Sequence, residues 1–147
     1  MRKRFLYCFV VILCVAVVSG AAYAAFDKCH LCGMKIEGNE NTAYEIQYKD
    51  GKTATLCCPH CGLWVHASDK DSIKEARARD FISGEWMDPS KMYFVFKSKA
   101  IPACAPSWIA FGKKSEAESF VKGFGGKVYS FSEATKERLK HPKGMEM

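Results

Sequence analysis

The segment 43–61 reads AYEIQYKDGKTATLCCPHC. Residues 43–48 and 53–57 are both rich in β-forming residues, and apolar and polar side chains alternate along the first of them. Between them lies an Asp-Gly pair at positions 50 and 51, a strong short-range signal for a hairpin turn. Pro59 suits the first position of a helix, because its φ is already helical and no donor is needed there. The segment therefore predicts a β-hairpin followed by a helix.

The next segment, residues 73–81, fits two interpretations. Its Glu-Ala-Arg-Ala-Arg core favours a helix, whereas the alternation that begins at Ile73 favours a strand. We favour the strand, because two further strands follow at 92–96 and 108–111, where aromatic and β-branched residues are concentrated.

A second helix is expected near residue 115. Ser115 and Glu118 have the spacing of a capping box, in which each side chain bonds the backbone N–H of the other residue. Apolar residues follow at helical spacing, and glycines at 123, 125 and 126 end the helix. A strand over 127–131 and a terminal helix over 132–139 complete the pattern.

The order strand-strand-helix-strand thus occurs twice, at about 41–82 and about 91–131. The sequence predicts an α+β fold of two such units, with helices packed on antiparallel sheet. Residues 25–140 have the length of one compact domain. The polar residues 141–147 are expected to form a flexible tail.

Residues 1–24 are predicted to be a secretory signal peptide. Positions 2 to 4 are basic, and the apolar run over 5–18 is too short to span a bilayer. Small residues at positions 22 and 24 predict cleavage before Ala25. The protein is therefore expected to be periplasmic or otherwise exported, with a membrane tether as the alternative if the leader is retained.

The charge of the chain argues against a nucleic-acid partner. The formal charge is +6, but three of the 22 basic residues belong to the leader. Without them, 19 basic residues (22 minus 3) stand against 16 acidic residues, and the two signs are interspersed.

Five of the six cysteines outside the leader fall between residues 29 and 61. One C-x-x-C pair lies in CHLCGM at 29–34 and the other in CCPHC at 57–61, on either side of the predicted hairpin. Thiolate and thioether ligands select soft metals such as copper(I). Structural zinc, a redox-active pair and, in an oxidising compartment, disulfides are the alternatives.

Two of these alternatives have specific features. The tetrapeptide Cys58-Pro59-His60-Cys61 matches the active site of DsbA-like thiol oxidases, and a helix N-terminus would lower the pKa of the Cys58 thiol. A thioredoxin fold, however, needs a strand and a helix before this motif. For zinc, the 25 residues between the pairs exceed the ribbon spacing of about 15 to 20.

Met34 favours copper over zinc. Gly33 allows a tight turn, and the polar residues that follow Met34 do not predict a buried run, so the thioether is expected to face the cysteines. A thioether binds copper(I) and contributes nothing to a zinc site. His30 and His60 place imidazoles in the same region, and His60 is included among the predicted ligands.

The pattern Cys-x-x-Cys-Gly-Met, followed by Tyr48–Lys52 and then Cys-Cys-x-x-Cys, resembles the heavy-metal-binding modules called YHS and TRASH. Over residues 29–135 the chain also resembles the NosL family, most clearly in Ala110-Phe111, the helix around Phe120 and the Gly-Gly-strand ending. Those are exported accessory proteins that supply copper to nitrous oxide reductase. The resemblance implies a duplicated strand-strand-helix-strand fold and places Cys32 and Met34 in the metal-binding motif of the family.

The chain departs from this family in two places. Members are typically lipoproteins, and no lipidated cysteine is evident here. Many also carry Met-Gly before the Ala-Phe strand, where residues 102–106 read PACAP, so Cys104 is either a substitute soft ligand or a buried thiol. The cysteines at 57–61 exceed what one copper ion needs, which leaves a second ion, another metal or a redox role open.

The sequence thus predicts a non-enzymatic, exported copper(I) chaperone that passes its metal by ligand exchange to an exported copper enzyme, with nitrous oxide reductase as the family's usual recipient. The alternatives are a periplasmic thiol–disulfide oxidoreductase that uses Cys58 and Cys61, and a structural zinc module. The predicted metal ligands are Cys29, Cys32, Met34, Cys58, His60 and Cys61.

Overall fold

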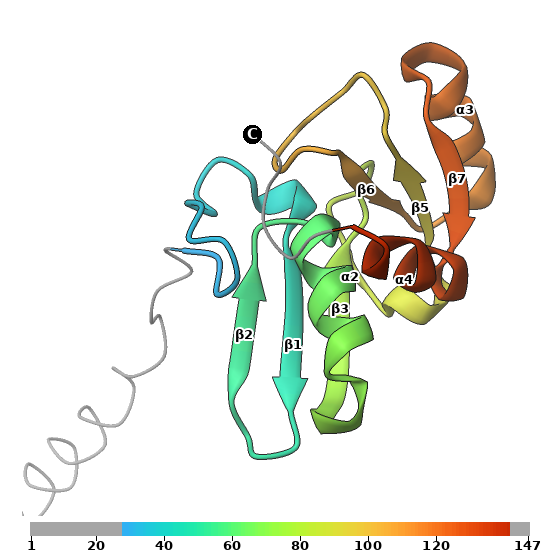
Figure 1. Ribbon diagram of the computed structural model, residues 1–147. Coiled ribbons are helices and arrows are strands. Elements are labelled where there is room, and N and C mark those ends of the chain that lie inside the picture. Colours follow the sequence, from blue (N-terminus) through green and yellow to red (C-terminus); the bar gives the residue numbers. More distant parts are fainter. Residues whose placement is uncertain (1–27, 142–147) are drawn as a thin grey trace, which may run out of the picture.

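The computed structural model describes residues 28–141 as two antiparallel sheets and three helices (Figure 1). The predicted α+β class is confirmed. The predicted leader at 1–24 and residues 142–147 of the predicted tail lie outside the described residues. Within 28–141, no helix is both long enough and apolar enough to cross a bilayer.

The first sheet is built on the predicted hairpin of β1 (Tyr44–Tyr48) and β2 (Thr53–Leu56). Gly51 in the turn has φ +88°, a conformation that glycine adopts without strain. β3 (Ile73–Arg79) pairs with the other edge of β1, which confirms the strand interpretation of this segment. The short β4 (Trp86–Met87) completes the order β2-β1-β3-β4.

The first helix, α2 (Pro59–Ser68), follows β2 closely and packs against β1. Gly62 permits the close approach, because a Cβ atom there would lie 2.2 Å from the ring of Tyr44. Tyr44 is fully buried, and its hydroxyl group hydrogen-bonds Nδ1 of His66, one turn further along the helix, at 2.9 Å. Sheet packing therefore fixes the position of the helix that carries Cys61.

The second sheet repeats this arrangement. β5 (Tyr93–Phe96) lies between β6 (Trp108–Phe111) and β7 (Lys127–Ser130), and α3 (Lys114–Phe124) packs against all three strands. In each unit the first strand is central, and the second and third strands flank it (Figure 1). Three short 3-10 turns each precede a strand. They are η1 (Glu40–Thr42) before β1, η2 (Lys70–Ser72) before β3 and η3 (Pro89–Lys91) before β5.

Two predicted details are wrong. Ser115 does not cap α3, which begins at Lys114 after an N-cap residue, Lys113, that makes no side-chain cap. The capping box lies instead at Ser130 and Glu133, which have the same S-x-x-E spacing. β7 therefore ends one residue earlier than predicted, and the last helix, α4 (Phe131–Leu139), begins one residue earlier.

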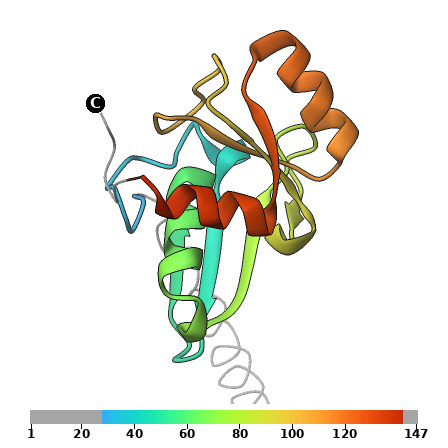
Figure 2. The ribbon, with the colours of Figure 1, turned by 45° about the vertical axis from the view of Figure 1, so that its right-hand side comes forward.

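α4 packs against α2, and the two views show these helices side by side (Figures 1 and 2). The contact includes Arg138, which is completely buried. Its Nε donates to the carbonyl oxygen of His60, and its Nη2 donates to Nε2 of the same residue, both at 2.8 Å. The last helix of the second unit thus supports the first turn of α2.

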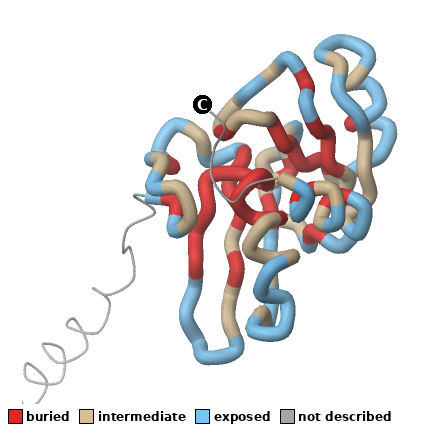
Figure 3. Tube along the Cα trace, in the orientation of Figure 1, coloured by how far each residue is buried: buried red, intermediate tan, exposed pale blue. Residues whose placement is uncertain are grey.

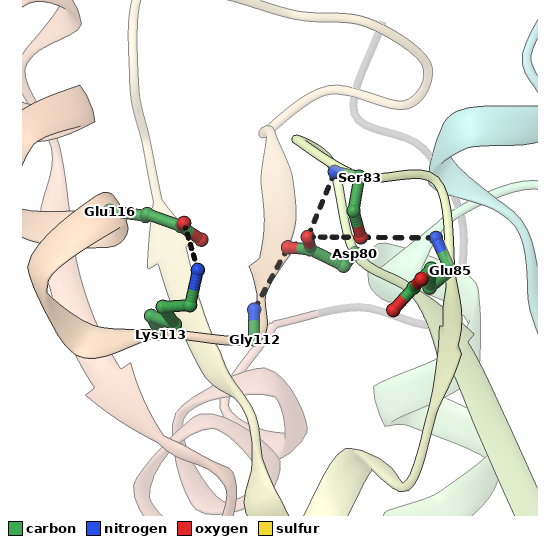
Figure 4. Close-up of polar contacts among 6 residues, drawn as sticks. All are labelled: Asp80, Ser83, Glu85, Gly112, Lys113 and Glu116. Carbon is green, nitrogen blue, oxygen red and sulfur yellow. Dashed lines mark hydrogen bonds and ion pairs between the residues drawn. The ribbon is translucent and has the colours of Figure 1, made fainter.

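The loop after β3 fastens the first unit to the end of β6 through Asp80 (Figure 4). Asp80 is buried; its Oδ1 accepts from the Gly112 backbone N–H at 2.9 Å. Its Oδ2 accepts from the backbone N–H of Ser83 at 2.9 Å and from the hydroxyl group at 2.7 Å. Burial opposes ionisation, but these hydrogen bonds outweigh it and hold the pKa of Asp80 below its ordinary value.

Buried residues are concentrated where the two sheets meet α2 (Figure 3). This core cluster contains five of the six described cysteines, and the sixth, Cys32, packs against it. A smaller apolar cluster lies under α3 and consists of Val95, Ile109, Phe111 and Ala117.

Candidate metal centre

The first C-x-x-C pair lies in a loop that is attached to β2. The backbone N–H of Cys29 donates to Met34 O at 2.8 Å, and that of Gly33 donates to Cys29 O at 2.9 Å, which closes the loop on itself. His30 joins it to the hairpin: its N–H donates to Thr55 O, and its Nδ1 accepts the Thr55 N–H, both at 3.1 Å. The hairpin therefore brings together cysteines that are 25 residues apart.

The second pair lies where β2 turns into α2. Cys58 is the N-cap residue in extended conformation, and its carbonyl oxygen accepts from the backbone N–H groups of Cys61 and Gly62 at 3.1 and 3.0 Å. The Thr42 hydroxyl group donates to Cys57 O at 2.8 Å. These bonds direct several thiols into the core beside one another.

Cys104 joins the cluster from the second unit. It lies in the connection 97–107 between β5 and β6, and its Sγ is 3.4 Å from that of Cys57 and 4.0 Å from that of Cys61. Sequence reasoning left the role of Cys104 open, and it left Cys57 out of the ligand set. The signal for Cys57 was its place directly before the C-x-x-C pair.

The six sulfurs form two overlapping groups. One consists of Cys29, Cys32, Cys57 and Cys61; the other of Cys57, Cys58, Cys61 and Cys104. Within each group all sulfur atoms lie within 4.8 Å of one another, and all six cysteines of residues 28–141 are free thiols. Of the cysteines predicted as ligands, Cys29, Cys32 and Cys61 come together in the first group, whereas Cys58 belongs to the second.

The spacing of the sulfurs suits a tetrahedral ion. Metal–sulfur bonds of about 2.3 Å place the sulfurs of a tetrahedral site about 3.8 Å apart. The distance from Cys57 Sγ is 3.6 Å to Cys32, 3.7 Å to Cys58 and 3.8 Å to Cys61. These three spacings are close to those of a thiolate-bound metal.

The thiols also prepare one another for ionisation. Hydrogen bonds from Cys57 and Cys61 lower the pKa of Cys29, and hydrogen bonds from Cys104, Cys57 and Cys61 lower that of Cys58. Cys57 and Cys61 donate hydrogen bonds and keep their protons. Their hydrogen bonds with Cys104 and Cys29 raise the pKa of both thiols. These hydrogen bonds therefore favour the thiolate form at Cys29 and Cys58 and the thiol form at Cys57 and Cys61.

His60 is buried close to the cysteines, but both of its ring nitrogens have other partners. Nδ1 donates to Pro106 O at 3.0 Å, and this tautomer leaves Nε2 to accept from Arg138 at 2.8 Å. Burial, and then the nearby guanidinium group, lower the pKa of His60, so the ring is neutral. In this conformation no lone pair of His60 is free for a metal, and it belongs to neither sulfur group.

Met34 is half-buried and packs against the core cluster that contains the cysteines. A backbone hydrogen bond links it to the Cys32 thiol and favours the thiolate, although burial outweighs this bond and raises the pKa of Cys32. The structure thus places Met34 in the region that the sequence predicts.

Comparison with known proteins gives concordant results. The NosL family model matches residues 21–139. A crystal structure of the copper chaperone NosL from Shewanella denitrificans superposes with a TM-score of 0.64 at 26% identity, covering 78% of this chain and 94% of that one.

A curated relative is the HTH-type transcriptional repressor CutR of Bacillus subtilis (strain 168). It is 33% identical over 117 residues, which cover 78% of this chain and 61% of the repressor. The chain thus spans about three fifths of that relative's length. The family match, the shared fold and the cysteine centre agree with the predicted resemblance, and the chain belongs to the NosL family.

Proposed function

We propose that this protein is a copper(I) chaperone whose receiving site consists of Cys29, Cys32, Cys57 and Cys61. The observation that carries the proposal is the convergence of these four sulfurs, from two separate C-x-x-C segments, within 4.8 Å of one another. A copper chaperone of the same family has the same fold, which supports copper as the cargo. Thiolates are ligands that select copper(I).

Exposure determines how the ion enters and leaves. Cys32 is half-buried, whereas the other three cysteines of the receiving site are at most 4% exposed. Copper therefore enters past Cys32 and Met34, and a thiolate, thioether or imidazole of the recipient displaces Cys32 first. Stepwise replacement of this kind passes the ion on without releasing it to water.

The same burial argues against catalysis by thiol–disulfide exchange. Cys58 and Cys61 are each 1% exposed, so a disulfide of another protein has no direct path to either sulfur. We therefore propose a carrier and not an enzyme. We further propose that it is exported by its leader and serves an exported copper enzyme, with nitrous oxide reductase as the candidate recipient that the family resemblance implies.

Anaerobic titration of the reduced chain with copper(I), in competition with a chromophoric chelator, tests the proposal. Tight binding is expected, and Cys29→Ser and Cys32→Ser should each bind less copper(I) than the wild type does at the same chelator concentration. Ser68→Ala, at the exposed end of α2, is the control and should bind as the wild type does. Failure of the wild type to compete while its thiols remain reduced would contradict the proposal.

A further inference from the structure

Building on the proposed function, we propose that the cysteine cluster holds two soft-metal ions, with Cys57 and Cys61 bridging them. The first ion occupies the receiving site. The second is bound by the shared pair together with Cys58 and Cys104. The protein thus carries two copper(I) ions in one thiolate cluster.

The number of sulfur donors matches the needs of two ions. Soft ions in thiolate sites take at most four protein ligands. Two tetrahedral sites that share one edge need six sulfurs: two that bridge and two terminal sulfurs for each ion. The described cysteines supply this set: the bridging Cys57 and Cys61, then Cys29 with Cys32 on one side and Cys58 with Cys104 on the other.

The arrangement of the sulfurs agrees with this division. Cys57 is 3.6 Å from Cys32 in one group and 3.4 Å from Cys104 in the other, so it is in contact with both. Thiolate sulfurs bridge readily, because each has several lone pairs. A single ion in the receiving site would leave Cys58 and Cys104 buried beside it without a role.

The charge around the second group favours an anionic cluster. The buried guanidinium group of Arg138 interacts favourably with Cys61, Cys58 and Cys104, three of the four members of the second group. Cys58 also stands at the N-terminus of α2, where the helix dipole stabilises negative charge. Both features lie on the side of the second ion.

The connection 97–107 holds Cys104 in place at both of its ends. Lys97 N donates to Ser107 O at 3.0 Å, and the hydroxyl groups of Ser98 and Ser107 bond each other at 3.0 Å. Two residues after Cys104, Pro106 O accepts a hydrogen bond from His60 Nδ1. His60 and Arg138 are thus positioning residues, which join this connection to the first turn of α2.

The binding step is an exchange of protons for metal. Each thiol that coordinates loses its S–H proton to solvent. The four terminal sulfurs form one sulfur–copper bond each, the bridging Cys57 and Cys61 form two each, and copper stays in the monovalent state throughout. No oxidant or reductant takes part.

The test counts copper ions per chain by native mass spectrometry after anaerobic loading, with X-ray absorption to detect a metal–metal distance. The wild type is expected to bind two ions, and Cys104→Ser and Cys58→Ser are each expected to bind one. Retention of that one ion shows that the variant has folded. Lys99→Ala, which changes an exposed side chain in the same connection as Cys104, is the matched control and should still bind two.

The outcomes separate this inference from the proposed function. A wild type that binds one ion at every copper concentration overturns the second site and leaves the chaperone intact. A wild type that binds none overturns both. If Cys104→Ser and Cys58→Ser still bind two ions, the bridged arrangement is wrong.

Discussion

The two units of the molecule share a strand order but differ at equivalent places. Between the second strand and the helix, the first unit has Cys57 and Cys58, and the second has Gly112 and Lys113. The first two strands are joined by the tight turn 49–52 in the first unit and by the long connection 97–107 in the second. The first unit therefore carries three of the six described thiols, the loop before it carries Cys29 and Cys32, and the second unit reaches across with Cys104.

This difference shows how a duplicated fold separates binding from support. Under α3 the second unit has an apolar cluster that needs no ligand. Beside α2 the first unit has thiols, and the second unit buttresses them with α4 and Arg138. The duplicated framework thus stabilises the cysteines from two directions.

The largest effect is expected from Cys57→Ser. Cys57 belongs to both sulfur groups, so its loss should weaken copper(I) binding at least about 100-fold. Mutation of residues that only hydrogen-bond a metal ligand already lowers metal affinity by up to about 100-fold. Chelator competition measures this loss. Gly112→Ala, at the equivalent place in the second unit, is the control. Its Cβ would lie 2.6 Å from Met87 Sδ, so the free energy of unfolding should fall. Both copper ions should still bind.

Gly62→Ala in α2 and Gly123→Ala in α3 should change the free energy of unfolding in opposite directions. The new Cβ atom would collide with the buried Tyr44 ring, and overpacking of this kind costs about 1 to 3 kcal/mol of unfolding free energy. Gly123→Ala in α3 meets nothing within 4 Å and should add about 0.5 to 1 kcal/mol. Urea denaturation of the metal-free chain measures both, and equal effects would show that α2 does not pack as described.

Local signals in the sequence predicted the first unit well. The Asp-Gly turn and Pro59 act over a few residues, so the hairpin and α2 follow from them directly. The capping box was assigned to the wrong serine because Ser115 and Ser130 have the same spacing, and only packing selects between them.

The sequence predicted the parts of the candidate site that are marked by short motifs. The C-x-x-C pairs marked most of the sulfurs. The place of Cys104 depends on a contact 47 residues away, and the hydrogen bond that occupies His60 spans 78 residues. No spacing rule in one sequence contains such contacts.

Asp80→Asn should loosen the joint between the units. Its carboxylate accepts three hydrogen bonds, and loss of the charge should cost about 1.5 to 3 kcal/mol at neutral pH. Because the folded state lowers the pKa of Asp80, its stabilisation is present above the unfolded pKa of about 3.9 and is lost as the pH falls through the folded value. Urea denaturation at neutral pH and near pH 3 should therefore show a difference between wild type and variant that shrinks in acid, and a constant difference would refute the ionic role.

The smallest effect, and the most selective, is expected from Met34→Leu. Met34 lies beside Cys32 at the entrance and is not one of the four sulfurs of the receiving site, and its thioether binds copper(I) but not zinc. The rate at which copper(I) exchanges with a competing chelator should therefore fall about tenfold, while the rate for zinc stays unchanged. Met92→Leu, a buried methionine beside β5 in the second unit, is the matched control, because the two side chains have similar volumes and Met92 lies outside both sulfur groups. Equal slowing for both metals in Met34→Leu would mean that Met34 only packs, and the choice of copper over zinc would then rest on the thiolates.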